Sequence, residues 1–86
     1  MKYIIVKGPV PDEELSAIVF PQRLNHKDVA RIHRANDHDV RLVGAGFVSF
    51  QDGKVSVFGE SESLRGMKAK PEDAEVIAKD FGCFVP

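Results

Sequence analysis

The sequence has very little cysteine, no tryptophan and no long apolar run. Its 86 residues include one cysteine, Cys83. A single cysteine cannot form an internal disulfide, and it excludes zinc sites that require several cysteine ligands. The longest run without a charged residue is residues 42–51, whereas a helix that spans a bilayer needs about 20 apolar residues. The sequence therefore predicts neither a disulfide framework nor a membrane-spanning segment.

Net charge is also nearly absent. Twelve basic and 13 acidic residues give a formal net charge of −1 at pH 7, and 43% of the residues are hydrophobic. Disordered chains combine fewer apolar residues with more net charge, so we expect one folded domain over residues 1–86. The N-terminal residues MKYIIVKGPVP lack the long apolar stretch of a secretory signal. We therefore expect a cytoplasmic protein that does not associate with membranes.

Valine and isoleucine are abundant, whereas leucine is scarce. There are 16 of the former and 4 of the latter, and β-branched residues favour strands over helices. Residues 2–7 carry apolar side chains on both faces of an extended chain. An interior strand, which is covered on both faces, has this pattern, so we predict a strand here. A second strand is expected over residues 16–20, where Pro21 ends it.

Two helices are indicated by the residues at their ends. Asn25 is a favourable N-cap for a helix over residues 27–35, and Asn36 suits its C-terminal end. Pro71 at a first helical position and Gly82 after a last turn predict a second helix over residues 71–81. Its apolar residues recur on one side of the helix, which must pack against the sheet.

The clearest element is a β-hairpin over residues 45–60. Asp52-Gly53 favours a two-residue type I′ turn. This turn places four residues on the face expected in the core: Val48, Phe50, Val55 and Val57. Phe47 pairs with Phe58 on the opposite face among serines, where the two rings form either a second small core or an exposed apolar patch.

These elements give the order β-β-α-β-β-α. They predict an α+β fold in which two helices cover one face of a largely antiparallel four-stranded sheet.

The residues that could carry chemistry do not combine into a catalytic or metal-binding motif. The segment HRANDHD over residues 33–39 contains nitrogen and oxygen ligands, but their spacing is poor, and such segments are typical of turns. Cys83, Ser61 and Ser63 have no motif that joins any of them to a histidine base. We expect a protein that is not an enzyme and that has no catalytic residue, no metal and no cofactor.

Basic residues gather around the first predicted helix: Arg23, Lys27, Arg31 and Arg34. The last three share one side of the helix, and a basic stripe of this kind can follow the phosphates of a nucleic acid. A solvated helix face is the competing interpretation, because the chain is slightly acidic and no aromatic residue is interleaved for base stacking. Nucleic-acid binding through these residues is the alternative function.

The C-terminal half contains the segments GFVSF, DGKVSVFGESESL and KPEDAEVIAKDF. In this half the chain resembles a group of small uncharacterised proteins encoded by phages and prophages. The resemblance implies a phage-derived accessory protein and assigns no catalytic residue to any position.

The apolar strand residues exceed what two short helices can cover on one face of a sheet. We therefore expect a small non-enzymatic module that contacts a protein partner, or a second copy of itself, through a sheet surface or edge. Phe47 and Phe58 are the candidate contact residues, because they point away from the face that carries Phe50 and Val55.

Overall fold

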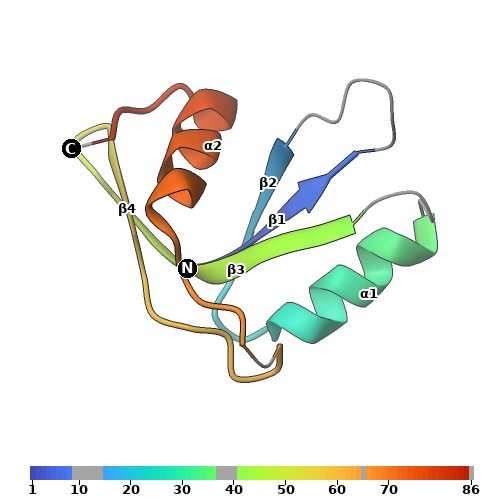
Figure 1. Cartoon of the computed structure of the whole chain (residues 1–86). Coiled ribbons are helices and arrows are strands. Elements are labelled where there is room, and N and C mark those ends of the chain that lie inside the picture. Colours follow the sequence, from blue (N-terminus) through green and yellow to red (C-terminus); the bar gives the residue numbers. More distant parts are fainter. Residues whose placement is uncertain (9–14, 37–40, 65, 86) are drawn as a thin grey trace.

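The chain folds into one four-stranded antiparallel sheet and two helices (Figure 1). The computed structural model describes residues 1–8, 15–36, 41–64 and 66–85, with residues 33–36 described by their backbone only. The elements are β1 (Lys2–Lys7), β2 (Leu15–Phe20), α1 (His26–Asn36), β3 (Arg41–Gln51), β4 (Lys54–Phe58) and α2 (Pro71–Phe81). The strand order across the sheet is β2-β1-β3-β4, and each neighbouring pair is antiparallel. The α+β class and the order β-β-α-β-β-α are therefore confirmed.

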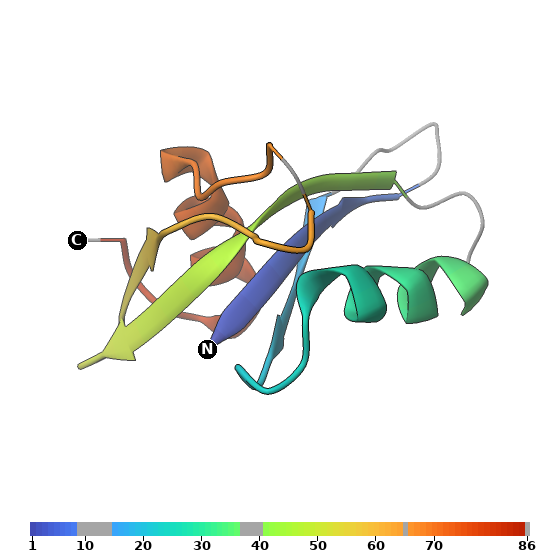
Figure 2. The same cartoon turned by 90° about the horizontal axis from the view of Figure 1, so that it is seen from below.

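The two helices lie on opposite faces of the sheet, so the expectation that both cover one face is wrong (Figure 2). Ile5 of β1 is buried in the cluster that contains Ile77 of α2. The adjacent Ile4 is buried in the cluster that contains Ala30 of α1. Side chains alternate along a strand, so a central strand that is apolar on both faces needs cover on both. One helix on each face provides that cover.

The second helix, α2, has the predicted bounds, and α1 extends one residue beyond the predicted range 27–35 at each end. The Oδ1 of Asn25 accepts a hydrogen bond of 2.8 Å from the backbone N–H of Asp28, so Asn25 caps α1. After α2, Gly82 has the left-handed φ of 67° that favours glycine at a helix C-terminus. Each helix has 11 residues, and among the described elements neither is long and apolar enough to cross a bilayer.

The β3–β4 hairpin has the predicted register. Phe50 pairs with Val55 and Phe47 with Phe58. The turn residues Asp52 and Gly53 have φ angles of 52° and 77°. Positive φ at both central positions defines the type I′ turn, whose twist matches that of the strands.

The outer side of β4 is partly occupied by other segments of the chain. Phe84 donates its N–H to the carbonyl of Gly53 and accepts from the N–H of Val55, both at 2.7 Å. Ala69 donates to the carbonyl of Gly59 at 2.8 Å. The C-terminal segment and the loop before α2 therefore line this edge of the sheet.

A buried polar contact joins β1 to the start of α2. The hydroxyl of Tyr3 donates to Oδ2 of Asp73 at 2.7 Å, and the same oxygen accepts from the N–H of Lys70 at 3.1 Å. A Cβ at Gly44 would lie 3.1 Å from the Asp73 carboxylate, and one at Gly46 would lie 3.0 Å from the Tyr3 hydroxyl. The two glycines of β3 therefore leave the space in which this contact forms.

Candidate binding surfaces

The predicted contact pair belongs to the β3–β4 hairpin, which extends beyond α1 (Figure 2), and Phe47 touches this helix at its first residue, His26. The rings of Phe47 and Phe58 stack with their centres 5.7 Å apart and their planes 20° apart. The side chain of Phe58 is 52% exposed, whereas Phe47 is half-buried. The Phe47 ring is therefore packed, as in a small second core, whereas the Phe58 ring faces solvent, as in an exposed apolar patch.

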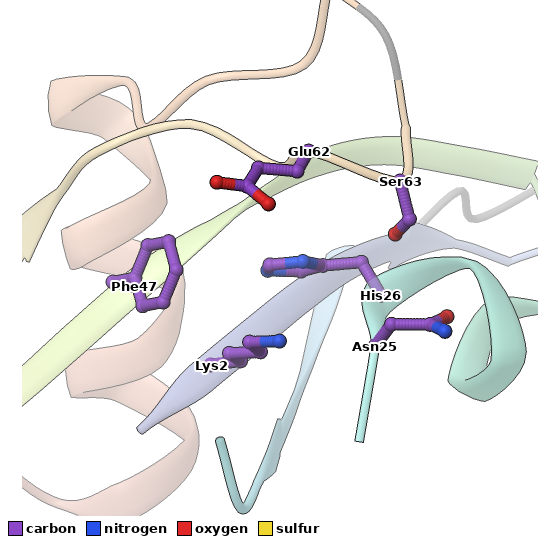
Figure 3. Close-up of a pocket in the computed structure, with 6 residues that line it drawn as sticks. All are labelled: Lys2, Asn25, His26, Phe47, Glu62 and Ser63. Carbon is purple, nitrogen blue, oxygen red and sulfur yellow. The ribbon is translucent and has the colours of Figure 1, made fainter. Parts of the chain in front are cut away.

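Phe47 forms one wall of a pocket of about 360 Å³, which Figure 3 shows in close-up. The pocket is lined by Lys2, Asn25, His26, Phe47, Glu62 and Ser63. The rings of His26 and Phe47 meet edge to face, with their centres 5.7 Å apart and their planes 83° apart. The ammonium of Lys2 lies 5.9 Å from the centre of the Phe47 ring, within the range of a cation–π contact. Residues from β1, α1, β3 and the loop after β4 therefore converge beside the exposed Phe58.

His26 is the residue of this pocket that sequence reasoning missed. Its side chain is 2% exposed, and Nε2–H donates to the carbonyl of Gly46 at 2.7 Å. Burial lowers the pKa of His26, and the nearby Lys2 lowers it further, against the opposing effect of the hydrogen bond to Gly46. A neutral imidazole therefore joins the start of α1 to β3. A histidine in a polar segment gives no local sign of burial, because the residues that bury it are distant in sequence.

Ser63 joins the loop after β4 to α1, and Ser61 forms a hydrogen bond within that loop. The Oγ of Ser63 accepts from the N–H of Lys27 at 3.0 Å, and the Oγ of Ser61 accepts from the N–H of Leu64 at 3.0 Å. Both hydroxyls thus satisfy backbone amides. Cys83, the remaining nucleophile candidate, is half-buried and directs its thiol to the carbonyl of Phe81 at 3.6 Å.

The basic residues of the nucleic-acid hypothesis are only partly described. Arg23, Lys27 and Arg31 are exposed, whereas the side chain of Arg34 lies outside the described residues. Lys27 and Arg31 belong to α1, which packs on the face of the sheet that also carries Phe47. The basic helix and the aromatic pair therefore lie on the same side of the molecule.

The HRANDHD segment, considered above as a source of metal ligands, lies largely outside the described residues, which do not include residues 37–40 or the side chain of His33. Among the side chains that are described, no group of three or more histidine, cysteine, aspartate or glutamate residues could hold a metal ion.

Phe50 departs from the expectation that it faces the core. Val48 and Val55 on the same face are 1% and 0% exposed, but Phe50 is 39% exposed. The Phe50 ring packs against Phe81, the last residue of α2, with the two ring centres 6.0 Å apart. The helix ends before it covers the tip of the hairpin, so Phe50 remains accessible.

The sequence matches no protein-family model, no curated protein and no solved structure closely enough to show a relationship.

Proposed function

We propose that this chain is a small non-enzymatic interaction module that binds a protein partner, or a second copy of itself, through Phe58 and the adjacent Phe47. Because segments of the C-terminal half resemble phage and prophage proteins, we further propose that the chain is a phage-derived accessory protein.

The exposed half of the Phe47–Phe58 stack is the observation that supports this function best. Phe58 is 52% exposed although an aromatic ring gains free energy when it leaves water. The adjacent Phe47 ring contacts His26 and Lys2, so the exposed Phe58 ring stacks on a ring whose position is fixed by these contacts. Preorganised aromatic side chains of this kind are enriched at the energetic centres of protein interfaces.

Photocrosslinking tests the proposal in cells that contain the partner. A benzophenone amino acid at position 58 should give one discrete crosslinked product, identified by mass spectrometry as a partner or as a dimer of this chain. The control places the same group at position 32, because Ile32 of α1 is 64% exposed and lies outside the aromatic pair. Equal, diffuse crosslinking from both positions would contradict the proposal.

Nucleic-acid binding is the second candidate function. It is favoured by the placement of exposed Lys27 and Arg31 on the same side of the sheet as the half-exposed Phe58. Cations that contact phosphates and aromatic rings that stack on bases are the combination used by single-strand binding proteins.

A titration with mixed-sequence single-stranded DNA and RNA distinguishes the two functions. Nucleic-acid binding predicts affinity that falls steeply with salt and that weakens in the double variant Arg31→Ala, Lys27→Ala. Absence of binding at low salt excludes it and leaves the protein-binding function in place.

A further inference from the structure

The outer edge of the sheet opposite β4 is formed by β2, whose backbone groups alternate between β1 and the outside. The N–H of Ala17 points away from β1, because it donates to Oδ2 of Asp80 in α2 at 2.8 Å. The two-residue period of a strand then directs the N–H and C=O of Val19 outward as well. Within the described residues these two groups of Val19 have no backbone partner. The middle of this edge is therefore open to a further strand.

Asp80 already occupies one of the positions at which such a strand would form a hydrogen bond. Its carboxylate oxygen occupies the place where the carbonyl of an added strand would accept from Ala17. The contact is exposed, so an incoming carbonyl can replace one oxygen acceptor by another.

A groove of about 330 Å³ lies between this edge and α2. It is lined by Leu15, Glu72, Glu75, Val76 and Lys79. Together with Asp80, α2 presents three carboxylates and one ammonium along the edge. A residue paired opposite Leu15 or Ala17 would direct its side chain to the same face of the sheet, beside α2.

We propose that the β2 edge binds an extended peptide segment of a partner protein as a fifth strand, with lysine or arginine at the alternate positions beside α2. The aliphatic stems of these residues would pack on Leu15 and Val76, and their charged ends would reach Glu72 and Glu75. A second copy fits less well, since pairing two β2 edges around Ile18 would bring the two Asp80 carboxylates together. This inference goes beyond the proposed function, because β2 and β4 lie at opposite edges of the sheet and the β2 edge is a site separate from Phe58.

A peptide titration followed by amide NMR tests the inference. The probe is Thr-Lys-Val-Lys-Val-Lys-Thr with blocked termini, compared with the same peptide carrying glutamate in place of lysine. We expect the lysine peptide to shift the amide signals of Ala17 and Val19 and to bind roughly tenfold more tightly than the glutamate peptide. Shifts confined to the hairpin, equal affinity for both peptides, or no shift with either peptide would each overturn the inference.

Two variants separate the backbone contribution from the charge contribution. Val19→Pro removes an outward N–H without removing a bond to β1 and should weaken binding, whereas Val19→Thr keeps this N–H and should not. Glu75→Lys should also weaken binding of the lysine peptide, and Glu60→Lys, the same charge change outside the groove, should not. Unfolding midpoints identify any variant that fails to fold, and the Glu75 and Glu60 pair, at exposed positions, then decides the result.

The failure of this inference is distinguishable from the failure of the proposed function. If the Phe58 surface binds a partner and the β2 edge binds no peptide, photocrosslinking from position 58 persists and only the edge proposal is lost. If self-association shifts the Val19 amide as the protein concentration rises without peptide, a second copy occupies the edge and the peptide proposal is overturned.

Discussion

The hydroxyl of Tyr3 donates a 2.7 Å hydrogen bond to Asp73, and this contact joins the central strand to the first turn of α2. Both side chains are buried, with exposed fractions of 0% and 3%. Tyr3→Phe removes the donor and should lower the free energy of unfolding by about 1–3 kcal/mol, because it leaves a buried carboxylate with one partner fewer. Chemical denaturation measures the loss. An unchanged midpoint would show that this hydrogen bond does not stabilise the fold.

The same contact makes the free energy of unfolding depend on pH in the alkaline range. Burial raises the pKa of Tyr3, and the hydrogen bond and negative charge of Asp73 raise it further. The folded state therefore keeps a proton that the unfolded chain loses near pH 10. Stability should be fully present below pH 10 and should fall as the pH rises above this value. Tyr3→Phe should be free of this fall, which thermal unfolding at several alkaline pH values can establish.

The buried His26 makes the free energy of unfolding depend on pH in the acidic range, where stability falls as the pH falls. Its pKa is lowered in the folded state, so the unfolded chain binds a proton more readily. The stability linked to this histidine is present above its ordinary pKa of 6.5 and is lost as the pH falls below it. Unfolding midpoints at pH 7.5 and pH 5.5 should differ more in the native chain than in His26→Asn. Equal differences would contradict a buried neutral imidazole.

Gly53 in the hairpin turn and Lys27 on α1 allow a constrained backbone position to be compared with a solvated side chain. Gly53 has a φ of 77°, so Gly53→Val should cost about 1–3 kcal/mol, because a β-branched residue rarely adopts this conformation. Lys27→Ala, at an exposed position of α1, should change stability by no more than about 0.5 kcal/mol. Denaturation of both variants gives the comparison, and equal midpoints would contradict the turn geometry.

Local signals predicted the elements, and their ends differ from the observed ones by at most one residue in β1, β2, α1 and α2. The Asp52-Gly53 turn predicted the hairpin register, because a two-residue turn leaves one pairing for all following residues. The distribution of the helices was predicted wrongly. An amphipathic helix shows which of its sides is buried and gives no information about the face of the sheet that it covers.

Candidate sites were predicted less completely than the fold. The pairing of Phe47 with Phe58 could be predicted because cross-strand pairing follows from the turn, whereas the pocket beside them depends on His26 and Lys2, which meet Phe47 only after folding. The signal that could have indicated Tyr3 and Asp73 is the pair Gly44 and Gly46. Two glycines on one face of a strand indicate that another group approaches it closely.

Phe58 is proposed to contribute mainly to binding rather than to folding. Phe58→Ser should lower the free energy of unfolding by no more than about 1–2 kcal/mol and leave the chain folded, because the ring is 52% exposed and loses only its stack on Phe47. The same variant should weaken binding of the partner recovered by crosslinking by at least about tenfold, as expected for a central aromatic residue of an interface. The matched control Phe81→Ser alters a ring of similar exposure, 50%, on the opposite face and should retain full affinity. Titration calorimetry of the three proteins with the purified partner gives the answer. Equal affinity of Phe58→Ser and the native chain would contradict the proposed role of Phe58 in binding.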